Sequence, residues 1–407
     1  MKVSALSATQ ADFEVETFVN QQVEEIRKTI GAGKAIVACS GGVDSTVSAV
    51  LTHRAVGNNL LCVFFDTGFM RLDEPRMVVE SLSMPPVQLP IKLFNVKRKF
   101  IKALQNLEDA EVKRKAFRET FYQVLSEKAR SEGCEFMVQG TIYPDIAETK
   151  GGIKTQHNVL EQIGIDPVEK YGFRVVEPVA KLYKGQVRAV ARYLGVPSNI
   201  SERQPFPGPG LAVRYLGKIR SSKLKALKLS TQVVESKIGV SKPEQYFSVI
   251  LENKLEKYPT EPIRKIVAGK LGVQGREVKV RIFQGQATGM VDGKRTYGKI
   301  VGVDISRKHR EEFGWLTEKL FVLQDEILSE NPSFTRVLYL ISEKGSRNPY
   351  VAVIRAIRTK DFMTADVAKL SWVVLNDTAG ELLKKCPDVS SVYYDITPKP
   401  PATIEFE

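Results

Sequence analysis

One seven-residue stretch constrains the fold of this chain more than any other: Ser40-Gly41-Gly42-Val43-Asp44-Ser45-Thr46. It follows an apolar run at 35–39 that is typical of a buried parallel strand, and the apolar residues from 47 onward predict a helix. In such a strand–glycine–helix connection the backbone N–H groups can approach an anion closely, and the helix N-terminus adds positive potential. A lone Ser-Gly-Gly would fit an ordinary capped turn, but the full stretch, with its three hydroxyl groups, predicts a phosphate-binding site.

Composition sets limits on the kind of protein this is. With 407 residues, 43% of them hydrophobic, the chain can form two or three globular domains. The sequence has no run of 18 apolar residues and no signal-peptide pattern, so it predicts a cytoplasmic protein. The four cysteines are scattered and form no CxxC pair, which argues against a zinc or iron–sulfur site and against a disulfide framework.

The formal net charge of +13 allows two interpretations: a nucleic-acid-binding surface, or a basic protein whose substrates are anions. The lysines and arginines are spread along the chain rather than gathered in runs. Helix-like segments such as 220–228 contribute much of the excess, and for these a solvated helix face is the favoured interpretation. We therefore expect neither a nucleic-acid partner nor a membrane partner.

Strand-like and helix-like segments alternate after a leading amphipathic helix within residues 1–30. The predicted positions are strands at 60–65, 87–96, 136–141 and 174–178, and helices at 110–132 and 184–194. Repeated strand–helix units predict an α/β fold, a doubly wound parallel sheet with helices on both faces. Ligands bind beyond the carboxyl ends of the strands in such sheets, and Asp66, Gly140 and Glu177 stand at those ends together with the loop at Ser40.

A change of pattern at 205–210 predicts a domain boundary, because three prolines and two glycines there exclude regular structure. We assign residues 1–205 to the leading helix and the α/β domain, and residues 206–407 to a second domain. The second domain has an α+β pattern, with elements expected at the following positions: helices at 224–236, 263–271 and 307–329, and strands at 278–283, 299–303, 337–341 and 350–357.

The loop lacks the Gly-Lys-Ser/Thr ending of a Walker A motif and resembles the PP-loop, SGGxDS, of the ATP pyrophosphatases. Five further motifs, in the order of the GMP synthetase family, extend the resemblance from about residue 14 to the end of the chain. These motifs are Gly140–Asp145, Lys154–Val159, Pro205–Gly210, Asp361–Asp366 and Lys399–Glu405. Each is weak alone, but the set is specific to that family.

The resemblance implies a reaction. In the family, XMP reacts with ATP at its C2 oxygen to give an adenylated intermediate and pyrophosphate, and ammonia then displaces AMP to give GMP. ATP and Mg²⁺ are therefore expected, with XMP and ammonia as substrates. No counterpart of the family's glutaminase domain is found, and we expect a separate glutaminase subunit to supply ammonia. The family also implies a homodimer, formed through the second domain.

The resemblance also implies roles for single residues, position by position. Those implied for adenyl transfer are Asp145, Glu148, Lys154 and His157. Those implied for ATP binding are Ser40, Gly41, Gly42, Val43, Asp44, Ser45, Thr46, Asp66 and Gly140, with Asp44 also a candidate Mg²⁺ ligand. Those implied for XMP binding are Arg114, Asp292, Lys399, Ile404 and Glu405.

Three features depart from the family pattern. Gln156 stands where the motif usually has the first of two histidines, and Ser391 stands where the family often has an arginine. Residues 304–348 form an insertion relative to short bacterial members.

Two other functions are compatible with the loop. A tRNA-modifying PP-loop ATP pyrophosphatase would fit the positive charge, but the missing CxxC pairs and the Lys399–Glu405 motif oppose it; tRNA bound to the purified protein would favour it. A non-catalytic nucleotide-binding regulator would show no pyrophosphate release that depends on XMP.

Overall fold

The computed structural model describes residues 13–150, 166–291, 294–312, 318–345, 348–360 and 363–406. The chain divides into two compact units, each with a β-sheet and a hydrophobic core. The first unit comprises Met1–Ala103 and Lys115–Gly208, and the second comprises Leu104–Arg114 and Pro209–Glu407. The predicted domain boundary divides the chain only once, near residue 205. The structure also groups Leu104–Arg114 with the second unit, which that boundary does not predict. The functions assigned to the two predicted domains stay predictions.

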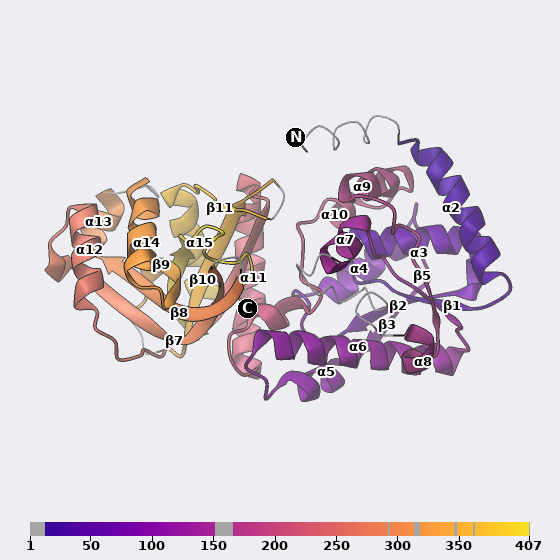
Figure 1. Cartoon of the computed structure of the whole chain (residues 1–407), viewed down its shortest axis with the longest axis horizontal. Helices are drawn as coiled ribbons and strands as arrows, with labels where there is room; N and C mark the ends of the chain where they lie inside the picture. Colours follow the sequence, from indigo (N-terminus) through magenta and orange to yellow (C-terminus); the bar gives the residue numbers. More distant parts are fainter. Residues whose placement is uncertain are drawn as a thin grey trace. The chain divides into compact units, whose positions relative to one another are not determined.

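In the described part of the first unit, the sheet has five parallel strands in the order β3-β2-β1-β4-β5 (Figure 1). The strands are β1 (Ala35–Ala38), β2 (Leu60–Asp66), β3 (Ile91–Asn95), β4 (Phe136–Val138) and β5 (Arg174–Val176). Val37 of β1 pairs with Cys62 of β2 on one side and with Val138 of β4 on the other. The predicted doubly wound parallel sheet is confirmed. Strand order reverses between β1 and β4, which is the position where such sheets bind ligands.

Helices cover both faces of this sheet (Figure 1). On one face lie α2 (Val15–Ile30), α3 (Val43–Val56), α4 (Glu74–Ser83), α9 (Lys184–Tyr193) and α10 (Ser198–Ser201). On the other lie α5 (Lys97–Leu104), α6 (Ala110–Glu132) and α8 (Pro167–Tyr171). The first face has a mainly aliphatic core, whereas Phe65, Phe121 and Tyr122 form ring contacts against the second face. Helix α7 (Tyr143–Lys150) follows β4.

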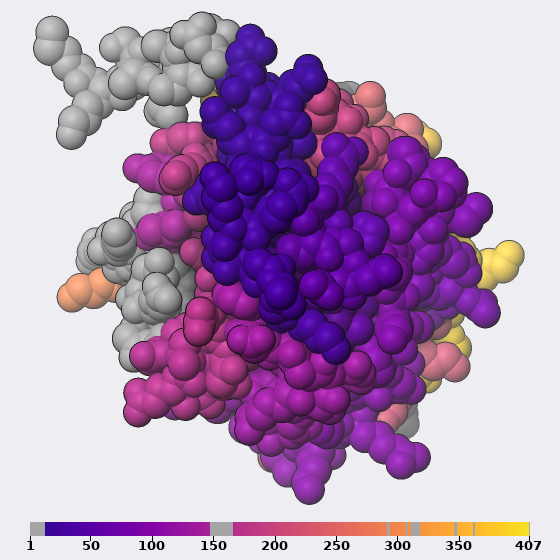
Figure 2. All heavy atoms as spheres, turned by 90° about the vertical axis from the view of Figure 1, so that its right-hand side faces the viewer, coloured from indigo at the N-terminus to yellow at the C-terminus, as the bar shows by residue number. Residues whose placement is uncertain are grey.

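The leading helix α2 packs rather than projecting freely. It buries Val19, Ile26 and Ile30, whose spacing of seven and four residues places them on one side of a helix. Figure 2 shows α2, in indigo, lying along the surface of the first unit. Among the described residues, no helix is both long enough and apolar enough to cross a membrane.

Among the residues described for the second unit, the sheet has seven strands in mixed orientation, in the order β11-β10-β12-β9-β8-β7, with β6 also paired to β10. They are β6 (Gln245–Glu252), β7 (Val278–Val291), β8 (Lys294–Ile305), β9 (Phe334–Glu343), β10 (Tyr350–Arg358), β11 (Asp366–Val367) and β12 (Val389–Asp395). Strands β7 and β8 form a long antiparallel hairpin, while β8 pairs with β9 in parallel. The predicted α+β character is confirmed.

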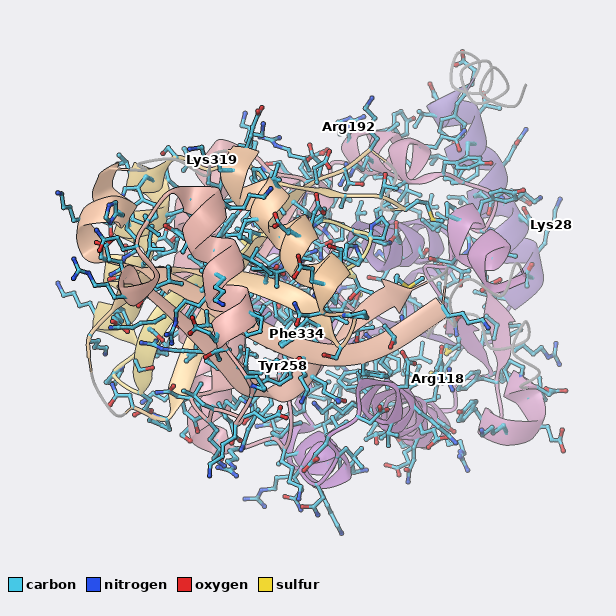
Figure 3. The ribbon with its side chains drawn as sticks, turned by 60° about the vertical axis from the view of Figure 1, so that its left-hand side comes forward. Lys28, Arg118, Arg192, Tyr258, Lys319 and Phe334 are labelled. Atoms are coloured by element: carbon cyan, nitrogen blue, oxygen red, sulfur yellow. The ribbon has the colours of Figure 1, made fainter. Side chains whose placement is uncertain are left out.

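The helices of the second unit are α11 (Ser221–Ile238), α12 (Glu261–Leu271), α13 (Arg307–Glu312), α14 (Glu318–Glu330) and α15 (Trp372–Lys385). Helix α11 packs against β6 and α15, and α14 packs against α12 and β9. At the start of β9, Phe334 meets Tyr258 edge to face, with ring centroids 5.2 Å apart (Figure 3). One expectation for α11 is wrong: Lys223 does not lie on a solvated face but is fully buried, and its ammonium donates to the carbonyl of Leu216.

Candidate active site

The predicted phosphate loop connects β1 to α3 at the position where strand order reverses. Helix α3 begins at Val43, four residues earlier than predicted, so Asp44, Ser45 and Thr46 belong to its first turn. The backbone N–H groups at the start of a helix have no partners within it and point toward the space beyond the sheet. Gly41 has a φ of +80°, and a Cβ atom there would lie 2.9 Å from Val78 Cγ2. Both observations explain why this turn requires glycine.

The three hydroxyl groups of the loop hold its shape. Ser45 Oγ donates to the carbonyl of Gly42 and lies 3.0 Å from Ser40 Oγ. Thr46 is fully buried, and its Oγ1 donates to the same Gly42 carbonyl at 2.8 Å. The hydroxyl groups therefore fix the backbone from which N–H groups can reach an anion. Their predicted direct contacts with ATP stay predictions.

Gly140, predicted as an ATP-binding residue, lies against the backbone of this loop. A Cβ atom at position 140 would lie 2.5 Å from the nitrogen of Ser45 and 2.6 Å from the carbonyl carbon of Asp44. The residue follows β4, the strand next to β1 across the reversal of strand order. Only glycine lets the end of β4 approach the first turn of α3 so closely.

Asp44 is the residue of the phosphate loop whose pKa is shifted. Its Oδ2 accepts a hydrogen bond from Lys184 Nζ at 2.6 Å, whereas its Oδ1 is buried and has no hydrogen-bond partner in the described part of the chain. Burial raises the pKa of Asp44 above its ordinary value; the ammonium of Lys184 opposes the shift and the carboxylate of Asp145 adds to it. The chain thus holds a half-buried carboxylate, 23% exposed, whose buried Oδ1 can still accept a donor or a cation.

Lys184 is a site residue that the sequence analysis did not select. It is the first residue of α9, the helix that follows β5, and its side chain is 44% exposed. Its contact with Asp44 joins positions 140 residues apart. The available signal was its place in the first turn of a helix beyond the carboxyl end of a parallel strand, where anions bind.

The catalytic residues predicted in the Gly140–Asp145 motif and beyond it are described only in part. Asp145, in α7, accepts a hydrogen bond from the nitrogen of Ile142 at 3.1 Å and is close enough to Asp44 to influence its pKa. Glu148 belongs to the same helix, but its side chain lies outside the described part. Lys154 and His157 lie outside the described residues.

Asp66, at the end of β2, already has partners for both carboxylate oxygens. Its Oδ1 accepts a hydrogen bond from the nitrogen of Gly68 at 3.0 Å, and its Oδ2 lies 2.9 Å from Lys97 Nζ. The carboxylate shapes the turn after β2. Its predicted contact with ATP stays a prediction.

The predicted XMP-binding residues all fall in the second unit. Glu405 is 18% exposed. Arg214 donates two hydrogen bonds of 2.9 Å to the Glu405 carboxylate, and Gln245 donates a third at 3.0 Å. Arg214 is fully buried and stacks on the ring of Phe247, 4.0 Å from its centroid. The orientation of the Glu405 carboxylate is therefore fixed by the chain itself.

Three fully buried side chains, which we call the C-terminal clamp, hold the segment that leads to Glu405: Arg336, Arg355 and Asp395. Arg355 donates to the carbonyls of residues 397, 403 and 404, and Arg336 donates to that of residue 405. Both guanidiniums share Asp395 Oδ2, at 3.2 Å from Arg336 and 2.6 Å from Arg355. Burial, together with the neighbouring Arg355, lowers the pKa of Arg336 to about 9. The clamp places Ile404 through its backbone carbonyl.

The structure brings other predicted positions together in pairs. The backbones of Lys399 and Ala365 exchange two hydrogen bonds, so the Lys399–Glu405 motif lies beside the Asp361–Asp366 motif. Arg114 pairs with Glu111 at 2.6 Å, and Glu111 also pairs with Arg295 of the β7–β8 hairpin. Asp292 lies outside the described residues.

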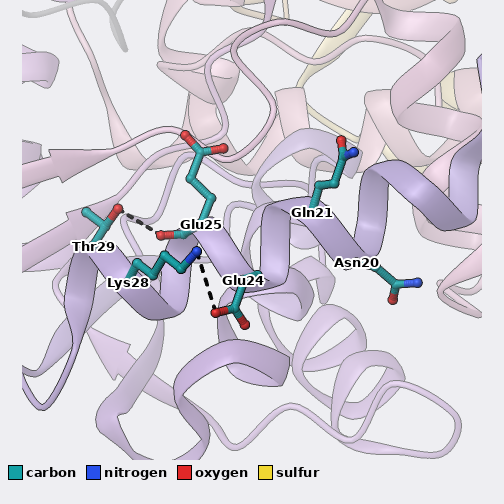
Figure 4. A pocket seen from close by; sticks show the side chains of 6 residues that line it. All are labelled: Asn20, Gln21, Glu24, Glu25, Lys28 and Thr29. Carbon is teal, nitrogen blue, oxygen red and sulfur yellow. Dashed lines mark hydrogen bonds and ion pairs between the residues drawn. The ribbon is translucent and has the colours of Figure 1, made fainter.

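A shallow hollow on α2 is unrelated to these positions (Figure 4). Six side chains of this one helix line it: Asn20, Gln21, Glu24, Glu25, Lys28 and Thr29. Lys28 lies 3.9 Å from Glu24, and Thr29 donates to the carbonyl of Glu25. The hollow is the side of a solvated surface helix, and no predicted site residue lines it.

Comparisons with known proteins place the chain in a family. A family model described as the GMP synthase C terminal domain matches residues 346–406, which include most of the C-terminal clamp, and a model described as NAD synthase matches residues 14–132, which include the phosphate loop. The chain is 40% identical to a subunit of the glutamine-hydrolyzing GMP synthase of Sulfurisphaera tokodaii, over 97% of this chain and all of that protein. It belongs to the GMP synthase family.

Other members of the GMP synthase family match this chain over the same share of its length. The corresponding GMP synthase subunits of Saccharolobus solfataricus and Archaeoglobus fulgidus are 38% and 35% identical to this chain, in each case over 97% of it and all of the relative. The prediction of an enzyme of the GMP synthase family is confirmed. The match also decides against a tRNA-modifying PP-loop enzyme.

Proposed function

We propose that this chain catalyses the ATP-dependent amination of XMP to GMP through an adenyl-XMP intermediate. The observation that carries the proposal is the phosphate loop at the reversal of strand order, with Asp44 and Lys184 beside it, in a chain of the GMP synthase family. This arrangement suits cleavage of ATP between its α and β phosphates. The chemistry then depends on positioning and charge stabilisation rather than on a covalent enzyme intermediate.

The first step is adenyl transfer. The C2 oxygen of XMP attacks the α-phosphorus of ATP, a P–O bond forms, and the bond to pyrophosphate breaks with its electron pair leaving on pyrophosphate. The loop N–H groups and the N-terminus of α3 hold the leaving pyrophosphate. Lys184, partly exposed beside Asp44, supplies a compact cation to the same phosphates.

The second step is amination. Ammonia attacks C2 of adenyl-XMP, a C–N bond forms, and the C–O bond breaks with its electron pair leaving on AMP. The attacking nitrogen must lose a proton. The groups proposed both for adenyl transfer and for accepting this proton are Asp145, Glu148, Lys154 and His157. Asp145 is the one whose described position lies near Asp44.

Mg²⁺ fits the residues around the loop. Asp44 Oδ1 is a buried oxygen without a partner in the described part of the chain, and carboxylate oxygens are the ligands that Mg²⁺ prefers. We propose that this oxygen would hold the ion. When bound, the ion neutralises phosphate charge in the transition state.

The proposed XMP site lies in the second unit. Lys399 would bind the phosphate of XMP, and Glu405 would accept an N–H group of the purine, with Ile404, Arg114 and Asp292 around the nucleotide. Arg214 and Gln245 supply three donors to Glu405, and a carboxylate has about four acceptor positions, so one remains for the base. The family also supports a homodimer formed through this unit, with a self-complementary interface.

Ammonia is proposed to come from a separate glutaminase subunit. The relatives are named as one subunit of a glutamine-hydrolyzing enzyme. All four cysteines of this chain are buried: Cys39, Cys62, Cys134 and Cys386. A hydrogen bond with Cys62, together with burial, raises the pKa of Cys39, and burial raises those of Cys134 and Cys386. Inert, buried thiols are poor nucleophiles for glutamine hydrolysis.

The nitrogen source tests this proposal. The purified chain, given ATP, Mg²⁺ and XMP, is expected to form GMP and release pyrophosphate with ammonium, and to form no GMP above the enzyme-free blank with glutamine as the only nitrogen source. GMP from glutamine at the ammonium rate would overturn the separate glutaminase. Pyrophosphate release that does not depend on XMP would overturn the substrate assignment.

Lys184→Met is expected to shift the pH profile of pyrophosphate release. Lys184 lowers the pKa of Asp44, so its loss lets the pKa rise further, and a larger fraction of Asp44 is protonated and unable to bind Mg²⁺ at a given acidic pH. The acid limb of kcat/KM for ATP should therefore move to higher pH, as well as the whole profile being lowered. Lys181→Met, an exposed lysine three residues earlier, serves as the control. If the acid limb of Lys184→Met coincides with that of Lys181→Met, Lys184 does not control the ionisation of Asp44 as proposed.

A further inference from the structure

A buried carboxylate near the phosphate loop holds two guanidinium groups. Glu74 is the first residue of α4, and its side chain is 3% exposed. Its Oε1 lies 2.7 Å from Arg203 Nη2 and 3.1 Å from Arg71 Nη1, and its Oε2 accepts a hydrogen bond from the backbone nitrogen of Arg71 at 2.9 Å. The guanidinium of Arg71 lies over the ring of Phe206, 3.9 Å from its centroid. We call Arg71, Glu74 and Arg203 the arginine–glutamate triad.

Within the triad, two guanidinium groups share one carboxylate. Arg71 is buried and Arg203 is 20% exposed, so water screens both charges poorly. Burying a guanidinium group is costly unless hydrogen bonds and opposite charges compensate it. An anion beside Arg203 would add such a partner.

The geometry shows where such an anion would bind. Arg203 uses Nη2 for Glu74, and its other terminal nitrogen, Nη1, lies 3.6 Å from the Cβ position of Gly41, the glycine of the phosphate loop. Within the described part of the chain, Nη1 has no hydrogen-bond partner. One edge of the guanidinium is thus fixed by a buried carboxylate, while the other faces the loop.

We propose that Arg203 is a catalytic residue that contacts the β- and γ-phosphates of ATP, and that Glu74 and Arg71 position it. The inference rests on the proposed adenyl transfer. As the bond between the α-phosphorus and pyrophosphate breaks, its electron pair adds negative charge to the leaving pyrophosphate. A guanidinium already held at the loop stabilises that charge without having to reorganise. It also presents paired N–H donors that match phosphate oxygens.

Arg203 lies close in sequence to the Pro205–Gly210 motif. It stands two residues before the motif, and Phe206 of that motif packs on Arg71. The motif therefore does more than connect two patterns of secondary structure. Its first aromatic residue supports the group that orients Arg203.

The test compares Arg203→Met with Arg192→Met. Arg192 is on α9, is 62% exposed and pairs with Glu202, so its loss removes the same charge away from the loop (Figure 3). Affinities of each full chain for Mg²⁺-pyrophosphate and for AMP are measured by calorimetry. Arg203→Met is expected to bind pyrophosphate about 10- to 100-fold more weakly and AMP within about twofold of the unmodified chain. Arg192→Met should bind both as the unmodified chain does.

Two further variants separate contact from structure. Free guanidinium at millimolar concentration should restore part of the pyrophosphate release of Arg203→Ala, a rescue that a purely structural arginine would not show. Arg203→Lys keeps a cation beside Glu74 if Arg203→Met fails to fold, and it should still lose pyrophosphate affinity because one ammonium cannot span both partners. If Arg203→Met or Arg203→Lys binds pyrophosphate as tightly as the control Arg192→Met does, the inference is overturned. Failure of the proposed function would instead appear in the unmodified chain, as absent XMP-dependent pyrophosphate release.

Discussion

Replacing Asp44 with asparagine is expected to reduce XMP-dependent pyrophosphate release by at least about a hundredfold while leaving the protein folded. An asparagine oxygen can still accept the hydrogen bond from Lys184, so the packing of the loop against α9 is kept. What disappears is the negative charge on a half-buried carboxylate whose buried Oδ1 has no hydrogen-bond partner in the described part of the chain. Without that charge the proposed Mg²⁺ ligand is lost.

The same substitution is expected to raise the stability of the unliganded protein at neutral pH. The pKa of Asp44 is raised by burial in the folded chain, so between its ordinary value of 3.8 and the raised value the folded state binds more protons than the unfolded state. The free energy of unfolding contributed by Asp44 therefore falls as pH rises through this window, and the cost remains at higher pH. Asparagine cannot ionise and avoids this cost. A thermal midpoint at or above that of the unmodified chain, measured without nucleotide and Mg²⁺, is the expected result.

Asp377→Asn provides the matched control, because Asp377 is an exposed carboxylate that pairs with Lys237 in the second unit. Its pyrophosphate release should equal that of the unmodified chain. A folded Asp44→Asn with full activity would show that the Asp44 carboxylate has neither a metal-binding nor a catalytic role. A large loss of stability would show instead that it is a structural group.

The phosphate loop and the parallel sheet could be predicted because their signals are local. An apolar run, two glycines and a helical pattern lie within a few residues of one another, and repeated strand–helix units permit few topologies. The start of α3 was misplaced because Asp44, Ser45 and Thr46 are good residues both for a loop and for a first helical turn. Strand β6 was not predicted, because the buried polar residues Gln245 and Ser248 interrupt the apolar run that marks a fully buried strand.

The electrostatic parts of the site could not be predicted from local patterns. Lys184 meets Asp44 across 140 positions, and Arg214 meets Glu405 across 191 positions. A lysine in a helix or an arginine after a proline-rich stretch has the same appearance in a sequence whether it faces water or a buried carboxylate. Lys223 illustrates the limit, because a helix that looks solvated contains a fully buried ammonium. Only the packing of the sheet decides which basic side chains converge on an acid.

The second large effect is expected from Gly140→Ala, the addition of one methyl group. The new Cβ would lie 2.5 Å from the nitrogen of Ser45 and 2.6 Å from the carbonyl carbon of Asp44, closer than any van der Waals contact allows. Its neighbours are backbone atoms, so no side-chain rotation can relieve the clash, and the end of β4 and the first turn of α3 must separate. Overpacking of this kind costs about 1–3 kcal/mol of stability. A displacement of about 1 Å at the phosphate site lowers activity about a hundredfold.

Gly269→Ala is the same chemical change in a place that accepts it. Gly269 lies within α12, and beyond its chain neighbours and the backbone of its own helix no described atom lies within 4 Å of its Cβ position. Alanine there should stabilise the helix by about 0.5–1 kcal/mol and leave pyrophosphate release unchanged. The pair separates the effect of steric contact with the loop from the general effect of replacing glycine. If Gly140→Ala unfolds at the same temperature as the unmodified chain and keeps its activity, β4 does not approach the loop as closely as the structure shows. If it is stable but releases pyrophosphate slowly, the position of the loop backbone itself sets the rate, because no side chain of the site has been altered.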